Sequence, residues 1–199
     1  MKLAPDVIPQ VRDSPAAQVA RAIAECHMGH PRLFIESYLW VKDVHDHLVP
    51  MRFTSNQDYY YRETFAKLTS LDQAMRVITV KARKAEWTTF AMACAFAFFY
   101  CVPGTDSLVI ADSDKSTIPL FAMMDRFANN LPEEWGPLPK ERWTRDYREI
   151  PHGGGAMSSS ITISSYKIAD FGRGRSPKLG IAEELGRWVP KVASPLVES

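Results

Sequence analysis

The sequence predicts a three-layer α/β domain with a parallel sheet, preceded by a helical N-terminal segment. Short runs of β-branched and apolar residues are typical of buried strands, and they occur at 77–80, 107–112, 160–164 and 179–182. Helical patterns separate the first three of these runs, at 88–100 and 117–130. Strands that alternate with helices indicate parallel pairing and right-handed crossovers, with a ligand site at the carboxyl ends of the strands.

The first 70 residues predict a helical lead-in, and residues 71–199 predict the core with an incomplete sheet. Residues 1–15 are rich in proline and predict no regular element. Apolar residues at helical spacing predict three helices in the lead-in, at 16–28, 33–44 and 58–68. Glycine and proline lie just beyond the first of these, as is usual where helices end.

Three features mark the boundaries of the core elements. Pro103 and Gly104 predict a turn between the first core helix and the second strand. Pro119 is expected in the first turn of the second core helix, because proline deeper in a helix removes a backbone hydrogen bond. Residues 131–157 are rich in proline, glycine and charge and predict a long excursion between elements.

Composition describes an ordinary soluble globular chain. Of its 199 residues, 46% are hydrophobic and 24% charged, and the net charge of +1 gives no overall attraction to nucleic acid. Its three cysteines lack zinc spacing, which suits a reduced, cytosolic protein. The start carries no signal-peptide pattern, and the longest apolar stretch, 90–102, is too short to span a bilayer.

The stretch 81–89, Lys-Ala-Arg-Lys-Ala-Glu-Trp-Thr-Thr, joins the first strand to an apolar helix. P-loop proteins hold a triphosphate on such a connection: N–H groups at the helix start face the phosphates, an amine neutralises charge, and a hydroxyl reaches Mg²⁺. The standard pattern G-x-x-x-x-G-K-[ST] is altered, since Glu86 replaces the second glycine and Trp87 the lysine. The stretch predicts a P-loop NTPase-like fold with an unusual phosphate loop.

A second signal lies far downstream, where the strand at 179–182 runs directly into Glu183 and Glu184. Adjacent acids at a strand end suit a nucleotidase, in which one carboxylate enters the Mg²⁺ shell and the other polarises the attacking water. Taken alone, the two acids would also suit the first turn of a helix, where the helix dipole favours negative charge.

These motifs, in this order, resemble the ATPase domain of large terminases, the DNA-packaging motors of tailed bacteriophages. Residues 81–89 are similar to the family's phosphate loop (Walker A), K-x-R-Q-x-G-x-[ST]-[ST], and residues 49–57 to its adenine-side segment, which ends on a glutamine. Residues 172–188 are similar to the run G-R-G-x-[ST] … [DS]-E-x-A-x-W, which contains Walker B. The resemblance covers residues 33–190.

The resemblance implies ATP and Mg²⁺ as the bound cofactors and assigns a role to each motif. Glu184 and Arg83 would be catalytic, and Thr88 and Glu183 would bind Mg²⁺. The nucleotide would be bound by Gln57, Lys81, Arg83, Lys84, Ala85, Glu86, Trp87, Thr88 and Thr89. The chain departs from the family at Glu86, where members keep glycine, and at Lys84, where they usually have glutamine. Glycine permits positive φ and a close approach to phosphate, whereas a carboxylate repels phosphate oxygens.

The resemblance also implies partners and a cellular setting. Double-stranded DNA would bind weakly to this chain alone, a homo-oligomeric ring would form, and the phage portal and small terminase subunit would be partners. The setting would be the cytoplasm of the bacterial host, with no membrane. The chain stops at Ser199, before the family's nuclease domain, so we expect no DNA cleavage by it.

Several alternatives stay open at this point. A non-hydrolysing remnant of the same fold, acting as an interaction or assembly module, is favoured by Glu86 and the missing C-terminal part. An unrelated soluble α/β enzyme is the third alternative. Gln57 would also suit a polar surface, and Arg173 and Arg175 the flanks of a glycine turn. For the histidines at 27–30 and 45–47 we expect surface positions rather than a metal site, because no complementary ligands are evident.

Overall fold

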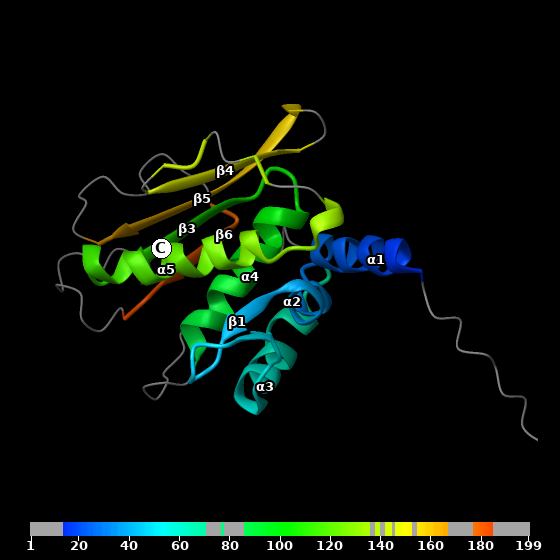
Figure 1. Cartoon of the computed structure of the whole chain (residues 1–199), viewed down its shortest axis with the longest axis horizontal. Helices are drawn as coiled ribbons and strands as arrows, with labels where there is room; N and C mark the ends of the chain where they lie inside the picture. Colours follow the sequence, from blue (N-terminus) through cyan, green and yellow to red (C-terminus); the bar gives the residue numbers. More distant parts are fainter. Residues whose placement is uncertain are drawn as a thin grey trace, which may run out of the picture.

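The computed structural model describes residues 14–70, 77, 86–135, 138–139, 142–144, 146–152, 155–166 and 177–184. Within these ranges the chain is a mixed α/β structure, with helices around a mostly parallel four-stranded sheet (Figure 1). The predicted α/β class is therefore confirmed. The strand predicted at 77–80 lies outside the described residues except for Val77, and the loop at 81–85 lies outside them entirely.

The N-terminal part contains three α-helices and a β-hairpin within the described residues. Its elements are α1 (Pro15–His27), α2 (Arg32–Tyr38), β1 (Trp40–Lys42), β2 (Leu48–Pro50), α3 (Ser55–Glu63) and the 3₁₀ turn η1 (Phe65–Lys67). The helices predicted at 16–28 and 58–68 correspond to α1 and to α3 with η1. Ser14 caps α1 by accepting a hydrogen bond from the N–H of Ala17, with Pro15 at the start of the helix.

The helix predicted at 33–44 was wrong in its second half. It ends at Tyr38, and β1 then pairs antiparallel with β2, with Trp40 opposite Pro50. The turn between the strands is closed by the carboxylate of Asp43, which accepts hydrogen bonds from the N–H groups of His45 (2.8 Å) and His47 (2.9 Å). This side-chain turn offers the backbone an alternative to continuing the helix.

The core elements are α4 (Trp87–Cys101), β3 (Asp106–Ala111), α5 (Asp114–Asn129), η2 (Glu133–Trp135), β4 (Tyr147–His152), β5 (Met157–Ser165) and β6 (Leu179–Ala182). The sheet has the order β4-β5-β3-β6, in which β3 is parallel to both β5 and β6. The strands predicted at 107–112, 160–164 and 179–182 are therefore confirmed, as is the parallel pairing among them.

Two predictions about the core were wrong. Part of the excursion at 131–157 is the edge strand β4, antiparallel to β5, and its Pro151 is tolerated because an edge strand leaves one row of N–H groups outside the ladder. The second core helix begins at Asp114 rather than Thr117, so Pro119 lies beyond its first turn. Its start is set by Ser113, whose hydroxyl accepts a hydrogen bond from the N–H of Ser116.

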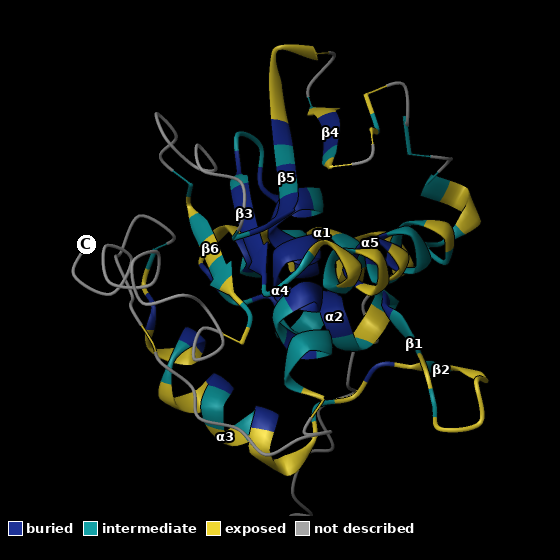
Figure 2. Cartoon of the chain, turned by 90° about the vertical axis from the view of Figure 1, so that its left-hand side faces the viewer, coloured by how far each residue is buried: buried dark blue, intermediate teal, exposed yellow. Residues whose placement is uncertain are grey.

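Helix α4 occupies the centre of the molecule. It contacts α1, α2, α5 and the strands β3 and β5, and Figure 2 shows most of it buried, with its first turn intermediate. A helix that is apolar all round belongs in a core rather than at a surface. No described helix is long and apolar enough to cross a membrane. The buried residues of α4 are Phe90, Met92, Ala93, Cys94, Ala95, Phe96, Ala97, Phe98, Phe99 and Cys101.

Candidate functional site

The start of α4 meets the carboxyl end of the parallel sheet. Thr88, in the first turn of α4, donates a hydrogen bond from its hydroxyl to Oε2 of Glu183, over 2.9 Å. Glu183 directly follows β6, and its N–H donates to the carbonyl of Ile110 in β3, which continues the parallel ladder. The two residues predicted to bind Mg²⁺, which are far apart in the sequence, therefore touch in the folded chain.

Glu86 immediately precedes α4 and has a left-handed backbone conformation, with φ 51° and ψ 22°. A residue with a Cβ adopts this conformation at a cost of about 1–2 kcal/mol, and glycine adopts it freely. Glu86 stands where the resemblance expects glycine, and its backbone has the conformation that glycine favours. That side chain makes no capping hydrogen bond and the first turn of α4 carries no acid, so this helix start suits an anion.

Left-handed backbone also marks the second predicted motif. Among the described residues, the non-glycine residues with positive φ are Asp46, Glu86 and Glu184. Two of these three are predicted site residues, and they stand at the two chain segments that the Thr88–Glu183 hydrogen bond brings together. Non-glycine residues held in this conformation are concentrated at functional sites, so their place supports a site at this edge of the sheet.

The side chain of Trp87 packs against α3. Its ring meets that of Tyr60 edge-on, with centroids 4.4 Å apart, and lies 5.2 Å from the ring of Phe90. The edge-on contact with Tyr60 stabilises the packing of the start of α4 against α3. With its indole committed to α3, what Trp87 can offer a phosphate is its backbone N–H at the helix start.

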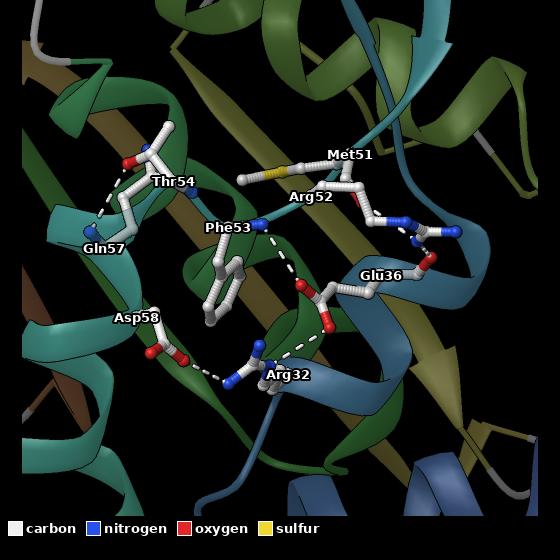
Figure 3. A network of polar contacts seen from close by, with 8 residues as sticks. All are labelled: Arg32, Glu36, Met51, Arg52, Phe53, Thr54, Gln57 and Asp58. Carbon is white, nitrogen blue, oxygen red and sulfur yellow. Dashed lines mark hydrogen bonds and ion pairs between the residues drawn. The ribbon is translucent and has the colours of Figure 1, made fainter.

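The side chain of Gln57 is buried, with 2% of its surface exposed, and joins α3 to the start of α4. Its Nε2 donates a hydrogen bond to the carbonyl of Glu86 (3.0 Å). Its Oε1 accepts one from the N–H of Thr54 (3.0 Å), and Figure 3 shows Gln57 beside Thr54. Thr54 in turn accepts from the N–H of Gln57, which completes a capping box on α3. The sequence T-x-x-Q could have revealed this cap. The contact of Gln57 with adenine stays a prediction.

A polar network anchors the segment around Phe53 to the neighbouring helices (Figure 3). The guanidinium of Arg32 in α2 pairs with Glu36 at 3.0 Å and with Asp58 of α3 at 2.5 Å, and lies 5.1 Å from the centroid of the Phe53 ring. Glu36 also accepts a hydrogen bond from the N–H of Phe53 (3.1 Å). The adenine-side segment predicted from the sequence is therefore held from α2 and α3 by contacts that sequence reasoning missed.

A further acid lies at the same edge of the sheet. Asp112 directly follows β3 and accepts hydrogen bonds from the hydroxyls of Ser113 and Ser116. The register pairs Ile110 with Ala182, so Asp112 and Glu183 follow the ends of neighbouring parallel strands at the same edge of the sheet. Sequence reasoning did not select Asp112, although an aspartate that ends a buried apolar strand is a signal of an edge site.

The structure describes only some of the remaining residues that the sequence singles out. Thr89 is half-buried in the first turn of α4, whereas Lys81, Arg83, Lys84 and Ala85 lie outside the described residues, as do Arg173 and Arg175. His45 and His47 are exposed on the β1–β2 turn. In the part of the chain that the structure describes, no group of three or more His, Cys, Asp or Glu side chains is arranged to hold a metal ion.

No protein-family model matches this chain, and no curated protein is similar to it in sequence.

Proposed function

We propose that this chain binds ATP with Mg²⁺ at the start of α4 and hydrolyses it, as the P-loop ATPase domain of a large-terminase DNA-packaging motor. The observation that carries this proposal is the hydrogen bond from Thr88 in the first turn of α4 to Glu183 at the end of β6. It pairs a hydroxyl and a carboxylate, oxygen ligands that suit Mg²⁺, beside a helix start that suits phosphate.

The donor set fits a metal that arrives with its nucleotide. Mg²⁺ is commonly bound by one or two protein side chains, while phosphate oxygens and water complete its octahedral shell. When bound, the ion would neutralise charge on the phosphate oxygens. Thr88 and Glu183 would hold it, and the N–H groups of the first turn of α4 would bind phosphate. Lys81 and Arg83 remain the residues expected to neutralise the rest of the phosphate charge.

Glu184 is proposed to orient the attacking water and to accept its proton. It leaves the line of β6 at once, since its φ is 54°, whereas Glu183 continues the ladder and reaches Thr88. Two adjacent acids can therefore serve different places in one site. This division supports the assignment of Glu183 to the metal and Glu184 to the water.

The wider role follows from the resemblance of the motifs and their order. Hydrolysis would drive movement of double-stranded DNA in a homo-oligomeric ring, with the phage portal and the small terminase subunit as partners in the bacterial cytoplasm. This chain by itself is proposed to bind DNA weakly and not to cut it. A non-hydrolysing assembly module is the second candidate, and Glu86 favours it because it puts a carboxylate at the position where the resemblance expects a glycine of the phosphate loop.

Mg²⁺-dependent nucleotide binding tests the proposal directly. In titrations with a fluorescent ATP analogue, the parent chain is expected to bind more tightly with Mg²⁺ than with EDTA. Glu183→Gln and Thr88→Val should each remove most of that difference, because each takes away an oxygen ligand of the ion. Thr88→Ser keeps the hydroxyl and should match the parent, and Glu63→Gln, at an exposed residue of α3, serves as the charge control. A parent chain that binds no nucleotide with Mg²⁺ would refute the proposal.

Replacement of Glu86 by glycine is expected to tighten nucleotide binding about fivefold. An exposed carboxylate near phosphate is screened by solvent, so its removal is worth about 1 kcal/mol. Glu86→Gln removes the charge but keeps the Cβ, so it should tighten binding similarly. Only Glu86→Gly should also raise the melting temperature, because glycine relieves the left-handed backbone. Titration and thermal unfolding of the two variants separate the effect of the Glu86 charge from the effect of its backbone conformation. Unchanged nucleotide binding in both variants would mean that phosphate does not bind near Glu86.

A further inference from the structure

We infer that Gln57 is a positioning residue for the phosphate end of the site: it fixes the backbone of Glu86 and the start of α4, and it does not select the base. This inference rests on the proposed function for its ligand. It changes the role that the resemblance implies for Gln57, from contact with adenine to control of the phosphate-binding turn.

The hydrogen bonds of Gln57 fix the orientation of its amide. The N–H of Thr54 can only donate, so Oε1 must face it, and the carbonyl of Glu86 can only accept, so Nε2 must face that. Each end of the amide therefore has a partner within the protein, and the side chain is 2% exposed. A side chain that selects adenine needs a polar atom directed at the base, and this burial directs both ends of the amide at backbone groups.

The partner of Gln57 is the carbonyl that begins α4. The Glu86 oxygen accepts both the amide of Gln57 (3.0 Å) and the N–H of Phe90 (3.1 Å), which is the first backbone hydrogen bond of the helix. These two bonds fix the orientation of the peptide between Glu86 and Trp87. That peptide carries the Trp87 N–H at the helix start, so a displaced carbonyl also turns this N–H away from its place.

Gln57 can fix this peptide because it is itself held. It lies in the first turn of α3, where it completes the capping box with Thr54, and the next residue, Asp58, pairs with Arg32 of α2 (Figure 3). Glu86 needs such support, since its left-handed backbone is disfavoured in a residue with a Cβ. The loss of Gln57 should therefore weaken the binding of every ligand whose phosphates contact the start of α4, whatever base the ligand carries.

The test compares ATP, GTP and inorganic tripolyphosphate, each with Mg²⁺, by calorimetric titration. Gln57→Met keeps the length of the side chain but has no N–H to donate to Glu86. We expect the three ligands to bind about tenfold more weakly, by similar factors. Glu63→Gln removes an exposed charge from the same helix, away from Gln57, and it should bind tripolyphosphate within about twofold of the parent. A loss confined to ATP would overturn the inference and restore adenine contact.

A second measurement needs no ligand. In thermal or urea unfolding, Gln57→Leu should destabilise the parent more than it destabilises the Glu86→Gly variant, because glycine adopts the left-handed turn without support. Additive effects in this double-mutant cycle would overturn the inference even where binding is absent. A parent that binds neither ATP nor tripolyphosphate, together with a non-additive cycle, would refute the proposed function and leave Gln57 as the residue that positions Glu86.

Discussion

Replacing Glu184 with glutamine is expected to lower the rate of ATP hydrolysis by about 100-fold or more, while ATP binding stays within about twofold of the parent. An amide keeps the size of the side chain but cannot accept the proton of the attacking water. Glu184 stands at the carboxyl end of β6, next to the residue that bonds Thr88, so the change removes a base without removing a metal ligand. Phosphate release under saturating ATP and Mg²⁺ measures the effect.

The control for this prediction is Glu63→Gln, which removes one exposed carboxylate on α3, paired with Lys67, and should leave hydrolysis unchanged. Equal turnover by the parent and Glu184→Gln would move the role of base to another acid at the same edge, either Glu183 or Asp112. A parent that binds ATP without turnover would favour the assembly module over the motor.

Replacing Phe96 with alanine is expected to lower the free energy of unfolding by about 3–5 kcal/mol. Phe96 is fully buried in α4, and its ring lies 5.5 Å from that of Phe127 and 6.1 Å from those of Phe99 and Tyr100. The substitution leaves a cavity where four aromatic rings meet, and close-packed neighbours cannot collapse to fill it. Urea unfolding followed by circular dichroism measures the loss.

A matched apolar control lies on the neighbouring helix. Ile118 of α5 is 67% exposed, and Ile118→Ala should change the free energy of unfolding by less than about 0.5 kcal/mol. The slope of the free energy of unfolding against urea concentration (the m-value) should be the same for both variants. The reason is that the surface exposed on unfolding hardly changes. A loss below about 1 kcal/mol in Phe96→Ala would mean that α4 is not the centre of the core.

Local pattern predicted the parallel strands and the helices but not every element. The strands β3, β5 and β6 are apolar or β-branched runs of strand length, which predict their own conformation. The β1–β2 hairpin was missed because Leu39 and Val41 continue a helical spacing, and only the turn at Asp43 shows where the helix must stop. Strand β4 was missed because Pro151 argues against a strand, and its place at the sheet edge is a tertiary fact.

The candidate site was also predictable only in part: its motifs were visible in the sequence, and the contacts that hold them were not. The two motifs predicted a shared Mg²⁺ site, and the hydrogen bond of Thr88 with Glu183 joins them. The ion pairs of Arg32 leave no periodic trace, because they join two helices whose relative placement the sequence does not state. The bond from Gln57 to a backbone carbonyl is of the same kind, since any residue could supply that carbonyl.

The burial of most of α4 limits how the proposed motor can deliver force. A helix close-packed against α1, α2, α5 and the sheet cannot slide like a piston without repacking the centre of the molecule. A movement that begins at its first turn would instead be transmitted to neighbouring elements. Glu183 connects that turn to β6, and Gln57 and Trp87 connect it to α3. Each cycle of hydrolysis would therefore tilt β6 or α3 relative to α4, while α4 itself stays in place.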